Sequence, residues 1–389
     1  MCPYFVNQPR TFQPRKTNLF SGLNIWGQDN IQNVYRHDLS SFFQFAFREL
    51  HPYADYHHNW HIDVMAHYLN LVSKGKIKKL IINMPPRMLK SQCVSIAWPA
   101  WELGRDSRKN FLCLHGSKAL GLDLHDQSLD LMLSKRYQSL FPNVRIKEEK
   151  NKLTTAFKGK RQFMTLNGKL TGLGADTIII DDPMSTEEAK CDETRKHINR
   201  QFDENILQRL SNKNGSIVVV MQRLHDNDLT GHLLAKNENW VHIDLSAIAL
   251  KDEVWDLPYG KTYHRSKGEV LHEARASQED LIETLHSVGG YAFAYQYLQG
   301  QYKPKFGESN KGCLWIDPMR EGEFYDVRER GSGKSGFYHF TEADLILPKV
   351  FGIGEDPYPS NMRHMFTIEE FEIAAEQLRI SQGLDKQQE

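Results

Sequence analysis

The sequence predicts an α/β fold in which helices flank a mostly parallel sheet. Three short apolar runs indicate buried strands, and polar or charged residues directly follow each of them; the runs are 79–83, 177–180 and 216–221. Continuous apolar runs, as opposed to alternating ones, are typical of strands that are covered on both faces. Ligands bind at the carboxyl ends of the strands in an open α/β sheet, so these polar residues predict one site at that edge.

The composition is that of an ordinary globular protein, with 40% hydrophobic and 25% charged residues in a chain of 389. Basic and acidic residues both number 49, so the formal net charge is zero and any contact with DNA must use local patches. We expect no membrane association, because we find neither a signal peptide nor an apolar run that could span a bilayer. The five cysteines show no paired spacing, which favours reduced thiols in a cytoplasmic protein.

The first apolar run leads into a loop that ends in Lys90-Ser91. Residues 84–89 read Met-Pro-Pro-Arg-Met-Leu, and residues 92–98 then open a helix. A helix start attracts phosphate through its free N–H groups and its partial positive charge. In a phosphate-binding loop, the lysine reaches the β- and γ-phosphates and the serine hydroxyl ligates Mg²⁺. This order predicts a P-loop NTPase of the RecA/ASCE type that uses ATP and Mg²⁺.

The loop departs from the usual pattern of this motif. Its two glycine positions fall on Met84 and Leu89, although glycine normally allows the positive φ and the close backbone approach that the loop needs. Taken alone, the stretch is equally compatible with a surface turn that leaves Lys90 solvated.

The second run ends in a pair of acids, Asp181 and Asp182, which Pro183 follows. Buried carboxylates are costly unless a cation meets them, and a P-loop enzyme holds its magnesium-binding acid at this place. The alternative interpretation is a helix start, which Asp-Asp-Pro also suits. The third run ends in Gln222-Arg223. Three strands therefore bring chemically active residues to one edge of the predicted sheet.

Further elements follow from apolar spacing. Helices are predicted at 39–50, 62–72, 119–134 and 187–210, and a further buried strand at 110–115. Residues 145–170 predict a β-hairpin region, which is the best candidate for a basic patch; a solvated hairpin face is the alternative. Its lysines are Lys147, Lys150, Lys152, Lys158, Lys160 and Lys169.

With these motifs in this order, the chain resembles the large subunit of tailed-phage terminases, the ATPase that drives DNA into a procapsid. The resemblance covers about residues 40–305. The motifs that carry it are Trp60-His61, the loop 84–91, Leu170–Asp176 leading into Asp181-Asp182-Pro183, Met221–His225 with Asp228-Leu229, and Tyr295–Gln299.

The resemblance implies a role for each matching residue. Lys90 and Ser91 would bind the phosphates and Mg²⁺ within the nucleotide-binding loop, which also includes Pro86, Met88 and Leu89. Arg87 would contact the γ-phosphate, and Asp181 would be the second ligand of Mg²⁺.

The remaining roles concern hydrolysis, coupling and the adenine base. Asp182 stands where many ATPases place the residue that polarises the attacking water. Gln222 and Arg223 would couple loss of the γ-phosphate to DNA movement. Trp60 and His61 would contact adenine.

The resemblance also implies partners: double-stranded DNA, a portal protein, a small terminase subunit, and further copies of the chain in a ring on the procapsid. It places the protein in the cytoplasm of a bacterial host cell. In such a ring a neighbour's arginine could complete the ATP site, and the candidates are Arg105, Arg195 and Arg209.

Three regions are predicted. Residues 1–37 form a flexible arm, 38–305 the ATPase domain, and 306–389 a C-terminal extension. The extension is shorter than a complete nuclease domain and shows no strand run that ends in an acid, so we expect no endonuclease activity from this chain. Gly331–Ser335 imitates a second phosphate loop but lacks a preceding apolar strand, and a terminal helix is predicted at 367–381.

Two other functions are compatible with the same motifs. One is a helicase-type ATPase that acts on nucleic acid without a capsid, although helicases usually pair two RecA-like domains. The other is a prophage remnant with a non-hydrolysing ATP site, although a remnant should have begun to lose Lys90-Ser91 and the acidic pair.

Overall fold

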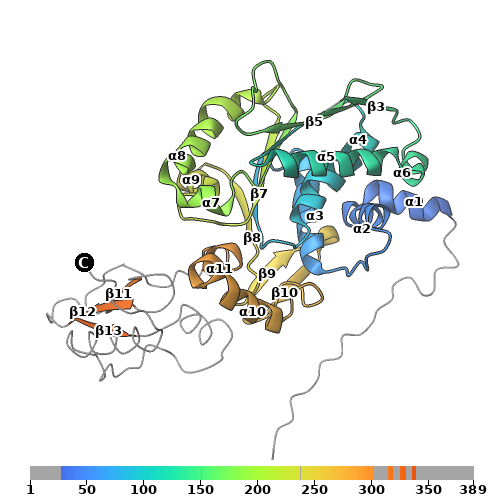
Figure 1. Cartoon of the computed structure of the whole chain (residues 1–389). Coiled ribbons are helices and arrows are strands. Elements are labelled where there is room, and N and C mark those ends of the chain that lie inside the picture. The colour runs from blue at the N-terminus through green and yellow to red at the C-terminus, as the bar shows by residue number, and fades with distance from the viewer. Residues whose placement is uncertain are drawn as a thin grey trace, which may run out of the picture.

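The structure is a computed structural model that describes residues 28–149, 151–236 and 238–301 and three short strands at 314–318, 325–329 and 335–338. Its centre is an eight-stranded sheet with helices on both faces (Figure 1), so the predicted fold class is confirmed. Within the described residues, no helix is both long and apolar enough to cross a membrane.

The strand order of the sheet is β3-β4-β5-β2-β6-β7-β1-β8. All pairs from β5 to β8 are parallel, whereas β3, β4 and β5 pair in antiparallel fashion. The strands are β1 Lys79–Asn83, β2 Asn110–His115, β3 Ile146–Glu149, β4 Lys152–Thr155, β5 Lys160–Thr165, β6 Thr177–Asp181, β7 Ser216–Met221 and β8 Val241–Asp244. The loop strand β1 and the acidic strand β6 are therefore separated by β7 alone.

Two apolar cores cover the two faces of the sheet. Alternate residues of β1 point to opposite faces, with Leu80 and Ile82 in one core and Ile81 in the other. The first core contains α2 (Leu39–Leu50), α3 (Trp60–Ser73), α4 (Trp98–Arg105) and α5 (Lys118–Leu133). The second contains the π-helix η2 (Phe202–Ile206) and α9 (Leu229–Ala235). This two-sided cover explains why the sheet strands read as continuous apolar runs.

The last ten residues of the predicted arm form a helix, and the domain boundary at residue 37 stays a prediction. Helix α1 spans Gln28–His37. It is attached to the domain by two hydrogen bonds, from Arg36 Nε to the Leu140 carbonyl at the end of α6 (Lys135–Leu140), and from Trp101 Nε1 to the Tyr35 carbonyl. Residues 1–27 lie outside the described part of the chain.

The prediction of one continuous helix at 187–210 is wrong. The structure has α7 (Thr186–Lys190), α8 (Asp192–Gln201), η2 and a 3₁₀ turn, η3 (Leu207–Arg209). The break lies at Cys191, whose backbone is extended. Arg195 stabilises this break, because its buried guanidinium donates to the Ala189 carbonyl at 2.5 Å and to Asp192 at 3.1 Å.

Beyond β8 the chain forms a smaller unit, which lies beside β8 (Figure 1). A hairpin of β9 (Glu253–Asp256) and β10 (Thr262–Arg265), with the 3₁₀ turn η4 (Pro258–Gly260) between its strands, is followed by α10 (Gln278–Val288) and α11 (Gly290–Gln296).

The C-terminal segment contains a three-stranded antiparallel sheet of β11 (Leu314–Pro318), β12 (Tyr325–Glu329) and β13 (Ser335–Tyr338). The expectation that no strand there would end in an acid is wrong, because β12 ends in Glu329. The predicted terminal helix at 367–381 and residues 331–334 of the second glycine-rich loop lie outside the described residues. The expected lack of endonuclease activity stays a prediction.

Candidate nucleotide site

The loop after β1 adopts a left-handed backbone at two residues. Arg87 has a φ of 64° and Leu89 a φ of 65°, and the helix begins at Lys90. Leu89 thus takes the conformation that glycine usually supplies at this position, at a cost of the order of 1–2 kcal/mol. At the other glycine position, the Met84 N–H donates to the Met221 carbonyl at 3.3 Å, so Met84 only continues the strand pairing.

His61 contributes to holding this loop in place. Its Nε2–H donates to the carbonyl of Met88 at 3.2 Å, and its Nδ1 accepts from Asn59 Nδ2 at 2.6 Å. Burial is the main cause that lowers the pKa of His61 to about 3, with nearby His272 adding to it, so the ring is neutral and carries the single proton that this arrangement needs. A second donor, Arg275, lies 3.4 Å from the Arg87 carbonyl.

The predicted lysine and acids lie together at the carboxyl edge of the sheet. Lys90 Nζ is 3.1 Å from Asp182 Oδ2, and the lysine side chain is only 7% exposed. Asp182 has a φ of 42°; its N–H donates to the Val220 carbonyl at 3.0 Å, and its carbonyl accepts from Gly116 at 3.1 Å. A Cβ on Gly116 would lie 2.6 Å from the Pro183 carbonyl oxygen, so this close approach requires glycine.

Asp181 is fully buried and accepts two hydroxyl hydrogen bonds from one helix. Ser91 Oγ donates to Oδ1 at 3.0 Å, and Ser95 Oγ donates to Oδ2 at 2.6 Å. Burial and the neighbouring Asp182 charge raise the pKa of Asp181 to about 7, against the lowering effect of the two serines and Lys90. Burial of a carboxylate costs free energy unless a cation pairs with it, so Asp181 is suited to bind a cation.

These groups fit Mg²⁺. A carboxylate and a hydroxyl are hard oxygen ligands, and Mg²⁺ in nucleotide sites is usually held by one or two protein groups, phosphate oxygens and water. Among the described residues, no three or more histidine, cysteine or acidic side chains are grouped so that they could hold a metal ion.

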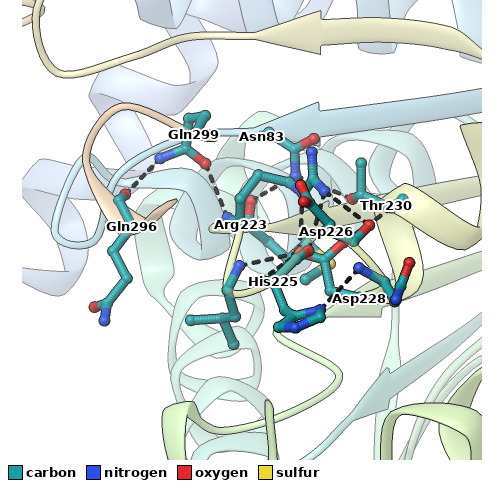
Figure 2. A network of polar contacts seen from close by, with 12 residues as sticks. Asn83, Arg223, His225, Asp226, Asp228, Thr230, Gln296 and Gln299 are labelled. Carbon is teal, nitrogen blue, oxygen red and sulfur yellow. Dashed lines mark hydrogen bonds and ion pairs between the residues drawn. The ribbon is translucent and has the colours of Figure 1, made fainter. Parts of the chain in front are cut away.

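The third motif forms a compact polar network (Figure 2). Arg223 Nε donates to both oxygens of Asp228, at 3.1 and 2.9 Å, and the Arg223 N–H donates to Gln299 Oε1 at 3.0 Å. Asp228 is fully buried and caps α9 by accepting from the Gly231 N–H at 2.9 Å. Arg223 is thus fixed within its own turn, and Gln222 beside it has a buried Oε1 for which the described residues provide no partner.

Trp60 lies in an aromatic stack with the β9–β10 hairpin. Its ring is 4.5 Å from the ring of Tyr263 at an interplanar angle of 10°, with Trp255 on the same hairpin 6.5 Å away. Only 8% of Trp60 is exposed. The predicted adenine contacts of Trp60 and His61 stay predictions.

The three candidate arginines for a neighbour's site all have partners in their own chain. Arg105 lies over the ring of Trp101 and near Glu102, and Arg209 donates to the carbonyls of Asn205 and Leu170. Arg195 holds the break before α8, as described above. Arg87, in contrast, is exposed at the loop.

No role was predicted for Ser95, Asp228 or Gln299, although Asp228 and Gln299 lie in motifs that carry the resemblance. Ser95 had a signal, because it lies four residues after Ser91 on one helix face. Asp228 precedes an apolar run and could have been read as a helix cap. Nothing near Gln299 in the sequence indicates its contact with Arg223, which is 76 residues away.

No protein-family model and no curated protein matches this sequence. Among solved structures, the chain is similar to the HK97 bacteriophage large terminase, at 11% identity and a TM-score of 0.40, over 71% of this chain and 62% of that one. It is also similar to the large terminase of a thermophilic bacteriophage in complex with ATP-gamma-S, at 10% identity and a TM-score of 0.37, over 83% and 74% of the two chains. The ATPase domain of a Thermus phage large terminase matches at 14% identity and a TM-score of 0.33, over 45% and 68%. The chain thus spans less than two thirds of the HK97 protein.

Proposed function

We propose that this chain is the ATP-hydrolysing motor subunit of a phage or prophage terminase, which moves double-stranded DNA into procapsids. The observation that carries the ATPase part is the meeting of Lys90 with Asp182, and of Ser91 with Asp181, at the carboxyl edge of a parallel sheet. The motif order of the sequence supports the terminase part.

The phosphate chain of ATP would lie over the loop 84–91. Lys90 leaves Asp182 for the β- and γ-phosphates, which frees that carboxylate to orient and polarise the attacking water. Ser91 and Asp181 would hold Mg²⁺, which would neutralise charge on the phosphate oxygens. Arg87 is exposed beside the loop and is assigned to the γ-phosphate.

The assigned coupling residues are Gln222 and Arg223. Arg223 reaches Gln299 through its backbone N–H, so a change at the end of β7 would be passed to the chain segment after α11. In this proposal the partners are double-stranded DNA, a portal protein, a small terminase subunit and further copies of the chain in a ring. Trp60 and His61 remain the assigned adenine contacts.

The test is steady-state ATP hydrolysis by the purified chain, with and without double-stranded DNA. Turnover that requires Mg²⁺, disappears in Asp181→Ala and rises with DNA supports a motor subunit. A folded protein that binds ATP but shows no turnover is then given portal-bearing procapsids. Recovery of turnover would mean that the site needs its assembled neighbours, whereas continued inactivity would favour a degenerate remnant.

The helicase-type alternative has a separate test. A DNA-stimulated ATPase that unwinds duplexes without procapsids would replace the packaging proposal. Packaging of DNA into procapsids without strand separation would exclude the helicase.

A further inference from the structure

The helix that follows the phosphate loop contains a proline that leaves one carbonyl without its usual partner. Residues Gln92–Ala97 form the π-helix η1, and the Trp98 N–H donates to the Cys93 carbonyl five residues earlier. Pro99 follows in the first turn of α4. Since proline has no N–H and its ring crowds the carbonyl four residues earlier, Pro99 cannot give the Ser95 carbonyl its usual helical hydrogen bond, and the wider π-turn relieves the crowding.

Arg161 supplies the missing donors from a distant strand. Its Nε and Nη2 donate to the Ser95 carbonyl at 3.1 and 2.8 Å, and its Nη1 lies 3.3 Å from Nδ1 of His125. Burial, and then the Arg161 charge, lower the pKa of His125, so the neutral ring can accept this bond. Arg161 lies on β5 and is fully buried, and it forms no salt bridge within the described part of the chain.

The same serine connects this arginine to the candidate magnesium-binding acid. The Ser95 hydroxyl donates to Asp181 Oδ2 at 2.6 Å while its carbonyl accepts from Arg161. Ser91, four residues earlier, occupies the other oxygen of Asp181. The orientation of the Asp181 carboxylate therefore depends on the position of this one turn of helix.

We infer that Arg161 is a positioning residue for the nucleotide site: it holds the Ser95 carbonyl that Pro99 leaves free, and so keeps the Ser95 hydroxyl on Asp181. The inference rests on the proposed function in taking Asp181 as a ligand of Mg²⁺. Partners that orient a ligating carboxylate typically change metal affinity about 10- to 100-fold when they are removed.

The first experiment measures binding of a fluorescent ATP analogue in EDTA and over a Mg²⁺ titration. Ser95→Ala should raise the Mg²⁺ concentration for half-maximal enhancement of binding roughly tenfold or more, and should leave the affinity in EDTA unchanged. Ser95→Thr keeps the hydroxyl and should behave as the wild type. Ser128→Ala is the matched control, because Ser128 is a buried helical serine whose hydroxyl bonds only to Leu124 among the described residues. An unchanged Mg²⁺ dependence in Ser95→Ala would overturn the inference.

The second experiment tests the link between Arg161 and Pro99 by thermal unfolding without nucleotide. Pro99→Ala restores an N–H that can satisfy the Ser95 carbonyl. Arg161→Met should therefore lower Tm less in the Pro99→Ala background than in the wild type. Equal losses in both backgrounds would refute the link. Should Arg161→Met alone yield no folded protein, recovery of folded protein by Pro99→Ala supports the link, and lack of recovery refutes it.

The two experiments separate this inference from the proposed function. A wild-type chain whose nucleotide binding does not respond to Mg²⁺ would refute the ATPase proposal itself. The unfolding comparison of Arg161 and Pro99 variants does not involve ATP, so it reports on the helix geometry whatever the binding experiment shows.

Discussion

Lys90 and Asp182 form an ion pair of 3.1 Å between the start of the loop helix and the end of β6. The lysine is buried, so its charge is held at the edge of the sheet. The pair joins two motifs whose members, Lys90 and Asp182, are 92 residues apart in the sequence. Four expected outcomes follow from the site that it defines.

Replacement of Lys90 by alanine should abolish ATP turnover and leave the fold intact. Loss of one positioned group that stabilises transition-state charge commonly costs about 100- to 1,000-fold in rate. The measurement is steady-state hydrolysis together with a circular-dichroism melt. Lys76→Ala is the control, since Lys76 is exposed just before β1. Retained turnover in Lys90→Ala would show that the site is elsewhere.

Leu89 should tolerate residues that adopt a left-handed backbone. Leu89→Gly removes the strain of the φ of 65° and Leu89→Asn reduces it, so both should keep nucleotide affinity within about threefold. Leu89→Val should weaken it at least about tenfold, because β-branched residues are strongly disfavoured at positive φ. Nucleotide titration compares the three variants. Equal affinities for the valine and glycine variants would mean that this backbone conformation does not matter for binding.

Acid should destabilise the protein partly through His61. Burial lowers the pKa of His61 to about 3, below its ordinary 6.5, so the unfolded chain binds a proton that the folded chain does not. Stability from this group is therefore present above pH 6.5 and is lost as the pH falls toward 3, by up to about 1.4 kcal/mol per pH unit.

The His61→Gln variant checks this, since glutamine can still donate to the Met88 carbonyl. Its free energy of unfolding, measured in urea, should fall less than that of the wild type between pH 7 and pH 5. The exposed His57 gives the control His57→Gln, which removes a histidine outside the site. A slope for His61→Gln equal to that of the wild type would contradict a neutral buried ring.

When Mg²⁺ and nucleotide are removed, Asp181 should affect the pH dependence of stability in the opposite direction to His61. Its pKa is raised from 3.8 to about 7, mainly by burial, so the folded chain holds a proton that the unfolded chain has lost. Stability from this group is complete below about pH 4 and is lost as the pH rises through 7.

In EDTA, Asp181→Asn should consequently melt at a higher temperature than the wild type at pH 8, and the difference should shrink at pH 5. A rise of at least about 2 °C is expected, since each kcal/mol shifts Tm by about 2–4 °C in domains of 150–250 residues. Asp130→Asn, at an exposed position of α5, is the control. A variant that melts below the wild type at pH 8 would mean that the carboxylate is stabilised, not strained, by its surroundings.

The sequence predicted the central strands well because each is a continuous β-branched or apolar run with polar residues at its end. Thr177–Asp181 and Ser216–Met221 follow this rule, and their parallel pairing brings their ends together. The pairing of Lys90-Ser91 with Asp181-Asp182 could be predicted for the same reason.

Features that depend on particular side-chain contacts or on an unusual backbone conformation were not predictable. The break near Cys191 is stabilised by the bonds of the Arg195 side chain, and the place of Trp60 is set by Tyr263, about 200 residues later in the numbering. The left-handed backbone at Leu89 has no local signal, since leucine seldom adopts it. Pro99 did offer a clue to the irregular helix, because proline removes a helical hydrogen bond.

The antiparallel strands β3, β4 and β5 form one edge of the sheet, and this edge is protected against pairing with other chains. Its outermost strand, β3, carries Lys147, Glu148 and Glu149 in a row, and all three are exposed. A free strand edge offers unpaired N–H and C=O groups to other chains, and charged side chains oppose such pairing. These three charges therefore oppose the joining of this edge to a sheet of another copy of the chain.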